Sequence, residues 1–350
     1  MANFFARTLL SWHHAHHRPL PWGDNERDPY HIWLSEIIMQ QTRISQGAGY
    51  YLRFVERFPS VFDLSVASID DIMRLWQGLG YYTRARNLHK AAIYIVRDLN
   101  GHFPDSFEGL LALPGVGPYS AAAISSFAYG LPHAVVDGNV KRVIARFAGI
   151  TQSIDVASTQ DKIHELASGF MKDASPALFN QAIMNFGALV CKPQAPLCST
   201  CPLSKRCFAL RHDMVDALPV RSKKKVNRVR YFHFVRIEYR GKILLRRREE
   251  KDIWQGLYVL PFLEKKSSRS LSVSQINTFV TDLLGPCDYV YKDCSKPVLQ
   301  QLSHQTISGR FILLTLLASP RKLSEEYVWA AKRLIHTVAK PKMIADFLEQ

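Results

Sequence analysis

The sequence predicts a multidomain protein, with an all-α domain over residues 1–215 followed by a smaller α/β domain over residues 230–350. The 350 residues exceed what a single small core usually organises. In the first part, stretches such as residues 63–75 and 160–171 repeat apolar residues at three- and four-residue spacing, which is the period of a helix. Near residue 218 this pattern gives way to short, strand-like stretches.

Proline and glycine mark the joints of the helical part. Pro104 precedes one expected helix and Gly130 follows another. Residues 216–229 contain the basic run Arg221–Lys225 and are expected to be an exposed linker. The second domain is expected to hold a mixture of strands and one helix: strands at 230–239, 243–245 and 311–317, a turn at Gly241-Lys242, and a helix at 272–284.

The charge of the chain indicates a polyanionic partner. The formal net charge is +15, and residues 221–251 hold 13 Lys or Arg against 3 acidic residues. Such a surplus favours nucleic acid, because neutralising phosphates releases counterions. An anionic membrane surface or simple solubility are the alternatives.

Targeting signals are not evident in the sequence. We find no apolar run of 18 residues that would predict a transmembrane helix, and histidines between positions 13 and 17 interrupt any signal segment. We therefore expect a cytoplasmic protein without a membrane partner, associated with the nucleoid through DNA.

Four of the six cysteines lie within one short stretch, in the spacing Cys191-x6-Cys198-x2-Cys201-x5-Cys207. In a reducing compartment such a group indicates metal before disulfides. Zinc sites usually pair two short Cys-x2–4-Cys knuckles, and only one is present here. An iron–sulfur cluster tolerates less regular spacing, so we favour [4Fe–4S] over zinc or no metal. The other two cysteines, Cys287 and Cys294, are expected to be buried thiols.

Residues 113–121, Leu-Pro-Gly-Val-Gly-Pro-Tyr-Ser-Ala, predict a tight hairpin between two helices. The glycines let the backbone turn sharply, and Pro118 suits the first position of a helix. Free N–H groups at such a helix start bind a phosphate oxygen without reading sequence. We expect Gly115, Val116 and Gly117 to contact DNA, although an ordinary glycine-rich turn is the simpler alternative.

Two carboxylates are candidates for chemistry. Glu36 lies among apolar residues of an expected helix, where its charged form is disfavoured and its pKa rises, as a general acid requires. Asp137 directly precedes a helical run. Taken alone, each has a plain alternative, a surface Glu on an amphipathic helix and an Asp that caps a helix. Together they form a glycosidase-like pair.

These features resemble the MutY family of adenine DNA glycosylases in the endonuclease III, or helix-hairpin-helix, superfamily. Besides the hairpin and the four cysteines, the resemblance rests on the following stretches: residues 20–22, 28–30, 33–36, 40–42, 78–82, 84–87 and 136–139. It spans nearly all of the first 215 residues and is weaker beyond them. It implies a helix-hairpin-helix glycosylase domain with an iron–sulfur loop at 191–207, followed by a Nudix-like domain.

The resemblance also implies an activity, the removal of adenine opposite 8-oxoguanine or guanine in double-stranded DNA during base excision repair. Glu36 would protonate N7 of adenine. Asp137 would stabilise the oxocarbenium ion or attack it, supported with the sugar by Tyr119 and Asn139.

Further roles follow from the resemblance for residues that contact the DNA bases. The adenine pocket would be lined by Trp22, Met39 and Gln181. The gap left by the flipped base would be held by Gln41 and Tyr81. The 8-oxoguanine would be read by Ser303 and His304.

The second domain differs from two sequence patterns, the Nudix hydrolase helix and a segment of the MutY family. The Arg-Glu-x-x-Glu-Glu helix of Nudix hydrolases is missing from the sequence, so we expect neither pyrophosphate hydrolysis nor a nucleotide cofactor. The family's Phe-Ser-His segment corresponds to Leu302-Ser-His304, in which Leu302 removes an aromatic surface. The details of lesion reading therefore depend more on the polar pair.

Three rival functions were weighed against this one. A glycosylase-lyase needs a lysine amine just after the hairpin, where this chain has Tyr119. A thymine mismatch glycosylase fits less well with Glu36 and the long second domain. A non-catalytic iron–sulfur protein that binds DNA would not need both Glu36 and Asp137. We therefore expect a monofunctional adenine glycosylase.

Overall fold

The computed structural model describes the chain except residues 1, 17–22, 24–26, 223–226, 303 and 350. The chain packs into two compact units, residues 1–66 with 87–224, and residues 67–86 with 225–350. The passage from one to the other near residue 224 falls inside the expected linker. The segment 67–86, which we expected in the helical domain, packs with the second unit instead. Each unit is described by itself below.

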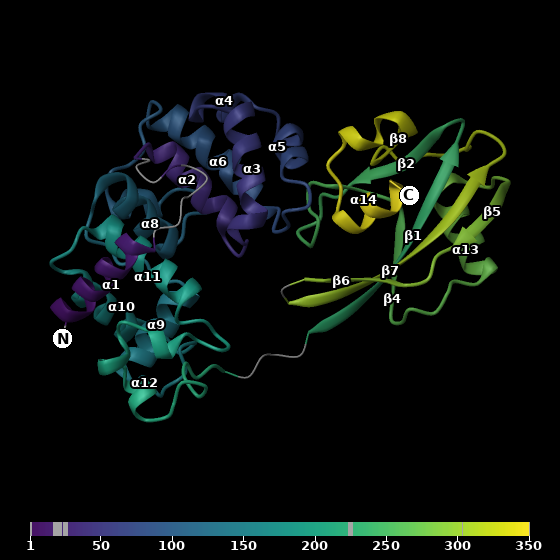
Figure 1. The fold of residues 1–350 in the computed structure, drawn as a ribbon. Helices are drawn as coiled ribbons and strands as arrows, with labels where there is room; N and C mark the ends of the chain where they lie inside the picture. The colour runs from purple at the N-terminus through teal and green to yellow at the C-terminus, as the bar shows by residue number, and fades with distance from the viewer. Residues whose placement is uncertain (1, 17–22, 24–26, 223–226, 303, 350) are drawn as a thin grey trace. The chain divides into compact units, whose positions relative to one another are not determined.

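The first unit is built from helices, which Figure 1 shows in purple to teal. Its elements are α1 (Ala2–Ala15), α2 (Pro29–Met39), α3 (Ile44–Arg57), α4 (Val61–Val66), α6 (Thr83–Asp98, which begins in segment 67–86), α7 (Phe107–Leu111), α8 (Pro118–Tyr129), α9 (Gly138–Ala148), α10 (Ala157–Met171), α11 (Pro176–Leu189), η1 (Cys198–Thr200), η2 (Ser204–Arg206) and α12 (Phe208–Arg211).

Local sequence signals set the ends of these helices. Pro118 opens α8, and Gly130 ends it in the left-handed conformation that glycine adopts without strain. The expected helix over residues 160–171 lies within α10. The one over 63–75 is wrong as a single helix, because Ser68 interrupts it. Its hydroxyl accepts the N–H of Asp71 and caps α5 (Ile69–Leu75).

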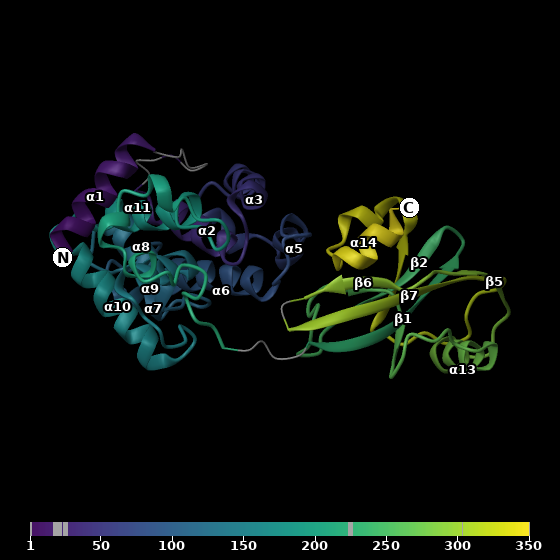
Figure 2. The same ribbon diagram turned by 60° about the horizontal axis from the view of Figure 1, so that its bottom comes forward.

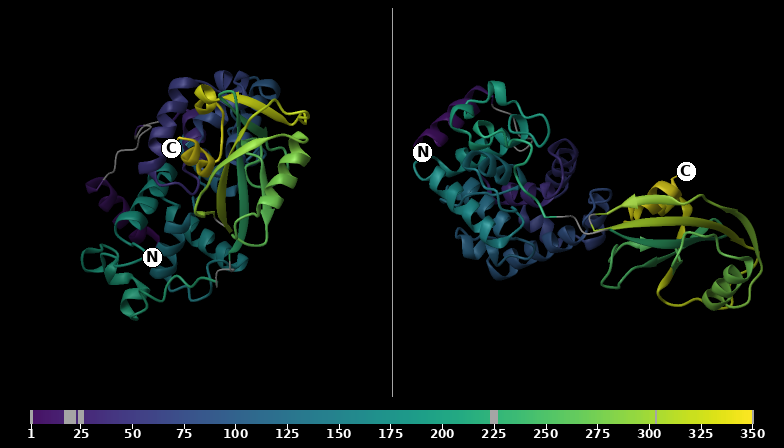
Figure 3. Two further views of the ribbon diagram at one scale, coloured as in Figure 1. Left: turned by 90° about the vertical axis from the view of Figure 1, so that its right-hand side faces the viewer. Right: turned by 90° about the horizontal axis from the view of Figure 1, so that it is seen from below.

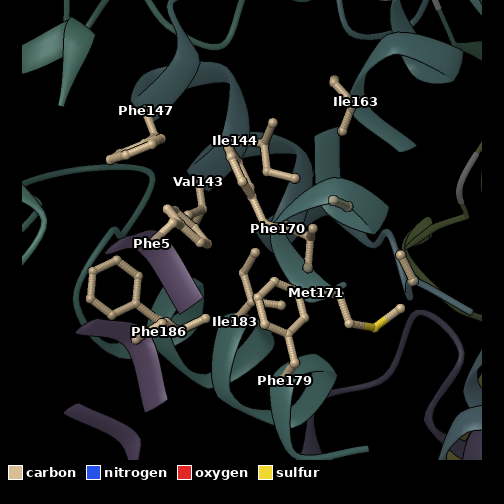
Figure 4. Close-up of a cluster of buried hydrophobic side chains, with 14 of the residues drawn as sticks. Phe5, Val143, Ile144, Phe147, Ile163, Phe170, Met171, Phe179, Ile183 and Phe186 are labelled. Atoms are coloured by element: carbon tan, nitrogen blue, oxygen red, sulfur yellow. The ribbon is translucent and has the colours of Figure 1, made fainter. Parts of the chain in front are cut away.

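The core of the first unit gathers aromatic and aliphatic side chains from α1, α9, α10 and α11 (Figure 4). Phe5 is fully buried, stacks on Phe170 with ring centres 4.4 Å apart, and meets Phe147 edge to face at 4.8 Å. Cys191, Cys201 and Cys207 pack against the same cluster. The cysteine loop is therefore anchored on the core that carries α9 and α11.

The second unit contains a sheet of eight strands, shown in green to yellow in Figure 1. Its elements are α5, β1 (Arg228–Tyr239), β2 (Lys242–Arg247), β3 (Tyr258–Val259), β4 (Phe262–Lys265), α13 (Val273–Leu284), β5 (Tyr289–Cys294), β6 (Val298–Gln301), β7 (Gln305–Leu316), β8 (Tyr327–Ala331), η3 (Lys332–Thr337) and α14 (Lys342–Leu348). The order is β3-β2-β1-β7-β5, with β8, β4 and β6 pairing beside β2, β1 and β7. The pairs are antiparallel except the central pair, β1 with β7.

Alternation along the central strands explains why helices cover both faces of the sheet. On one face, α13 packs on a cluster that includes Val235 and Ile312. The next residue back on each strand, Phe234 and Phe311, points to the other face, where Phe311 stacks on Phe347 of α14 at 3.9 Å. Figures 2 and 3 show α13 and α14 on opposite sides of the sheet. The expected smaller α/β domain is confirmed.

The elements expected in the second domain are confirmed within a few residues. The predicted strands lie in β1, β2 and β7, and the predicted helix is α13, which begins with a capping box between Ser272 and Gln275. The turn at Gly241 is left-handed, with φ +74°. Among the described residues, the helices are too short or too polar for one to cross a membrane.

Candidate active site

Glu36 lies in the middle of α2, between buried apolar residues such as Trp33 and Ile37. Asp28 caps this helix by accepting the N–H of Tyr30 at 2.8 Å, and Pro29 occupies the first position. Desolvation of its carboxyl, followed by the negative charge of Asp137, raises the pKa of Glu36 to about 7, and a hydrogen bond from Tyr119 opposes the rise. Glu36 can therefore carry a proton near neutral pH.

Asp137 is the N-cap of α9. It therefore caps a helix, as the plain alternative from the sequence had it, and it is at the same time the second catalytic candidate. One carboxylate oxygen accepts the N–H of Val140 at 2.7 Å, and the other accepts the Asn139 amide at 2.7 Å. Desolvation raises the pKa of Asp137, and these hydrogen bonds, with the charge of Arg142, oppose the rise. The backbone N–H of Asn139 also donates a hydrogen bond to this carboxylate.

Tyr119 completes the group from the first turn of α8, directly after the hairpin. Its hydroxyl hydrogen-bonds the Glu36 carboxyl. Burial, followed by the charges of Glu36 and Asp137, keeps the pKa of Tyr119 well above its usual value, so it stays a neutral donor. The structure thus brings together all four expected catalytic residues: Glu36, Tyr119, Asp137 and Asn139.

Arg142 is a functional candidate that the sequence analysis missed. It is buried. Its Nη2 donates to the Asn139 amide oxygen at 3.0 Å and to the Gly187 carbonyl at 2.7 Å. Its Nε donates to the Cys191 carbonyl at 2.7 Å. The sequence signal that could have identified Arg142 is an arginine between the apolar residues Val140 and Val143 of an amphipathic helix.

The four cysteines belong to one loop, and each is free and half-buried. Burial raises the pKa of Cys201 to about 11, and the charges of the other three raise it as well, so the thiols lie near enough to influence one another. The loop is tied to α9 by Arg146, which donates to the Lys192 carbonyl at 2.7 Å and to the Cys191 sulfur at 3.5 Å. In the described residues, no group of three or more metal-ligand side chains is arranged closely enough for a single metal ion.

The donor set of this loop nevertheless suits an iron–sulfur cluster. Four thiolates are the ligands that such a cluster takes, and a cationic guanidinium beside them stabilises the negative charge of the sulfur ligands. Three of the cysteines contact that core, and Arg146 supplies the cation. The residues present fit the group.

The two residues expected beside the flipped base share an uncommon backbone conformation. Gln41 has φ +55° and Tyr81 has φ +48°, in the left-handed region that costs a residue with a side chain free energy. Gln41 follows the end of α2 and is exposed, and Tyr81 is 44% exposed. Both side chains are thus presented to solvent at the end of a turn, as an inserting residue needs.

The hairpin forms between α7 and α8. Gly115 has φ +79°, and a Cβ there would lie 2.6 Å from the Cβ of Asn87, so this position requires glycine. Val116 is buried and its N–H donates to the Leu113 carbonyl, whereas Gly115 is exposed and Gly117 caps α8. The two glycines are therefore more exposed than the valine between them.

The remaining expected contacts are only partly described. Trp22 and Ser303 lie outside the described residues. Met39 and Gln181 are partly buried, on α2 and α11. His304 is exposed beside the turn into β7, where the Leu302 N–H donates to the Gln305 carbonyl at 2.8 Å.

Comparisons with known proteins show which proteins this chain resembles in sequence. Residues 34–168 match the family described as "HhH-GPD superfamily base excision DNA repair protein". The adenine DNA glycosylase of Buchnera aphidicola subsp. Schizaphis graminum is 35% identical over 350 residues, covering 99% of this chain and 98% of its own. The adenine DNA glycosylase of Homo sapiens is 41% identical over 213 residues, covering 59% of this chain and 39% of its own.

Solved structures resemble the helical part. A thermostable thymine-DNA glycosylase is 29% identical with a TM-score of 0.56, and the match covers 60% of this chain and 97% of that one. A trapped endonuclease III–DNA covalent intermediate matches with a TM-score of 0.50 at 23% identity, over 60% of this chain and 95% of that one. The first expectation, a helix-hairpin-helix domain followed by an α/β domain, is confirmed.

Proposed function

Because the chain belongs to the adenine DNA glycosylase family of the HhH-GPD superfamily, we propose that it hydrolyses the N-glycosidic bond of adenine mispaired with 8-oxoguanine or guanine. The observation that carries this proposal is the pairing of Glu36, whose pKa is raised to about 7, with Asp137 beside it. A carboxylic acid and a carboxylate are the two groups that cleavage of a glycosidic bond requires. The enzyme acts as a hydrolase in base excision repair.

In this mechanism, Glu36 is the general acid. Adenine is a poor leaving group as an anion, and a proton delivered to N7 by Glu36 lets it leave neutral. General acid catalysis of this kind contributes typically ~10²–10⁴-fold to a rate. Tyr119 donates a hydrogen bond to Glu36 and so holds the carboxyl in one orientation.

Asp137 acts on the sugar. As the bond to adenine breaks, positive charge builds on the sugar ring, and the Asp137 carboxylate stabilises that charge or attacks the carbon that bears it. Asn139 holds one of its oxygens and the N–H of Val140 holds the other, so the carboxylate cannot turn away. Water completes the hydrolysis.

The DNA would be held and opened by groups outside this pair. The hairpin glycines bind phosphate through the backbone, Gln41 and Tyr81 fill the gap left by the flipped base, and Met39 and Gln181 contact the adenine with Trp22. The net charge of +15 supports binding to a duplex wherever the DNA lies, which in a bacterium is the nucleoid. His304, together with Ser303, reads the 8-oxoguanine.

We assign the cysteine loop to a [4Fe–4S] cluster held by Cys191, Cys198, Cys201 and Cys207. When bound, this group supplies structure by cross-linking four points of one loop, and the reaction described above does not depend on electron transfer. The loop carries Lys192 and Arg206, whose positive charge would favour a polyanion.

The test is an excision assay on duplexes with adenine opposite 8-oxoguanine, opposite guanine and opposite thymine. We expect alkali-labile sites in the first two only, and strand cleavage that requires alkali, because Tyr119 stands where a lyase needs a lysine. The variant Glu36→Gln keeps the shape of the side chain but carries no acidic proton. Undiminished excision by this variant, or excision of thymine by the native protein, would contradict the proposal.

A further inference from the structure

Asn180 of α11 is fully buried and uses all the polar atoms of its side-chain amide. Its Oδ1 accepts the N–H of Val135 at 3.0 Å. Its Nδ2 donates to the His133 carbonyl at 2.9 Å and to the Ser126 hydroxyl of α8 at 2.9 Å. Because Val135 N–H can only donate, it determines which end of the amide is the oxygen. One side chain thus joins α11, α8 and the segment 131–136.

The buried backbone of residues 131–136 needs hydrogen-bond partners from outside a helix or strand. Residues 131–136 are assigned to neither helix nor strand in the described structure, although Ala134 and Val135 are buried. Buried backbone N–H and C=O groups require partners, which a neighbouring strand would normally supply. The Asn180 amide supplies one acceptor and one donor to Val135 and His133, two residues apart, as an adjacent strand would.

The segment leads directly to Asp137, which follows Val135 by two residues. On the far side, Asp137 is held by α9 through Val140 and Asn139. On the near side, the hydrogen bonds of Asn180 fix the backbone against α8, the helix that also carries Tyr119. Tyr119 in turn hydrogen-bonds Glu36. The two carboxylates are therefore connected through α8 by short, buried contacts.

We propose that Asn180 is a positioning residue that sets the place of the Asp137 carboxylate relative to Glu36, with Ser126 holding the Asn180 amide in the required orientation. This inference rests on the proposed function, because it matters only if Asp137 and Glu36 act as a pair. Asn180 acts through the backbone and does not contact the substrate. Misplacing a reacting group by about 1 Å can lower a rate about 10²-fold, so a small shift at residues 133–135 is enough.

Two neighbouring serines of α8 provide a matched test. Ser125 and Ser126 are both fully buried, and each hydroxyl donates to the carbonyl three residues earlier, of Ala122 and Ala123. Of the two, Ser126 is the one that accepts from Asn180. Ser126→Ala and Ser125→Ala therefore each remove one buried hydroxyl from α8, and the first also removes one of the hydrogen-bond partners of the Asn180 amide.

The main measurement is the rate of single-turnover excision of adenine opposite 8-oxoguanine. Duplex affinity and melting temperature are measured for each full-length variant as well. We expect Ser126→Ala to lower the excision rate about two- to tenfold, the worth of one neutral hydrogen bond, with unchanged affinity. Ser125→Ala should excise at the native rate with an equal change in melting temperature, and Ser126→Thr should restore the rate. Asn180→Asp, which loses both donations, should lower the rate by about tenfold or more.

The pH profile separates positioning from mere stability. Glu36 faces Asp137 and Tyr119, and the Asp137 charge contributes to its raised pKa. If Ser126→Ala lets Asp137 move away from Glu36, the loss of activity at high pH shifts to lower pH, which a purely structural defect would not cause.

The possible outcomes are distinct. Equal rates and equal pH profiles for the two alanine variants would overturn the inference, even if Asn180→Asp does not fold. Glu36→Gln is assayed beside them: if it remains active, the proposed function fails. If it is inactive while the two serine variants match, the positioning role alone fails.

Discussion

The Asn139 amide donates a hydrogen bond to the Asp137 carboxylate at 2.7 Å, while its own oxygen accepts a hydrogen bond from Arg142 at 3.0 Å. Arg142 also binds the Cys191 carbonyl, at the start of the cysteine loop. The candidate catalytic carboxylate and the loop are therefore two hydrogen-bonded side chains apart. We therefore expect a change in the cysteine loop to alter the position of the Asp137 carboxylate.

The first prediction tests this relationship. Asn139→Ala removes the partner of one Asp137 oxygen and leaves an Arg142 donor unpaired. Hydrogen bonds to charged groups are worth ~1.5–3 kcal/mol, so we expect excision to slow roughly 10- to 150-fold. Single-turnover rates measure the loss, and affinity for undamaged duplex should stay close to native. A variant with native excision would show that Asp137 does not need this partner.

The second prediction concerns pH. Folded Glu36 has its pKa raised to about 7, and the acid must be protonated to act, so excision should fall as pH rises through about 7. Tyr119→Phe removes the hydrogen bond that lowers this pKa, and the decline should then move to higher pH. Rate profiles of the native protein and the variant measure both effects. A decline at the same pH in both would contradict the assigned role of Tyr119.

The raised pKa of Glu36 also makes the stability of the folded protein depend on pH. Because the folded pKa of Glu36 exceeds the ordinary value of 4.5, the unfolded carboxyl loses its proton more readily. Protonation of Glu36 thus favours the folded state, and its contribution declines as pH rises from 4.5 through about 7. Melting temperatures of the native protein and Glu36→Gln over this range should converge at low pH and separate above it, with the glutamine variant the more stable.

The third prediction concerns Tyr81, exposed in a left-handed turn. Stacking of an aromatic side chain on a base is worth roughly 1–3 kcal/mol, so Tyr81→Ala should slow excision roughly ten- to hundredfold. Tyr81→Phe should retain most activity. Tyr94→Ala is the control, since Tyr94 is an exposed tyrosine of α6. Equal loss of excision and of non-specific duplex affinity in Tyr81→Ala would exclude an inserting role.

The fourth prediction concerns metal. The purified protein should be brown and hold four irons per chain, in line with its four clustered cysteines. Cys198→Ser should lower the iron content, whereas Cys287→Ser and Cys294→Ser, far along the sequence in the second unit, should leave it native. Iron and zinc analysis with absorbance spectra decides the matter. One zinc and no iron would refute the assignment.

The fifth prediction concerns the opposing base. His304→Ala should lower the preference for 8-oxoguanine over guanine, because the imidazole is exposed at the turn between β6 and β7. Excision opposite guanine should change little. His336→Ala, an exposed histidine of η3, is the control. If both histidine variants keep the native preference, the lesion is read by other residues.

Local patterns determined much of this protein from the sequence alone. The period of the apolar residues and the capping residues decided where helices lie, as at Pro118 and Gly130 for α8, because these effects act within one turn. The strand-like stretch at residues 230–239 and the apolar stretch at 311–317 likewise predicted strands, which correspond to β1 and β7. The sequence also named Glu36 and Asp137: each alone had a plain structural alternative, and the pair together with the family resemblance favoured a catalytic role.

Contacts between distant positions were decided only by the tertiary structure. Arg142 reaches Gly187 and Cys191, 45 and 49 positions away, and Asn180 holds Val135 from 45 positions away. Likewise, segment 67–86 packs with residues 225–350. The raised pKa of Glu36 depends on burial and on a charge 101 positions distant in the sequence (137 − 36). Such contacts arise because a buried polar group must find a partner wherever the packed chain places one, and no local pattern records that position.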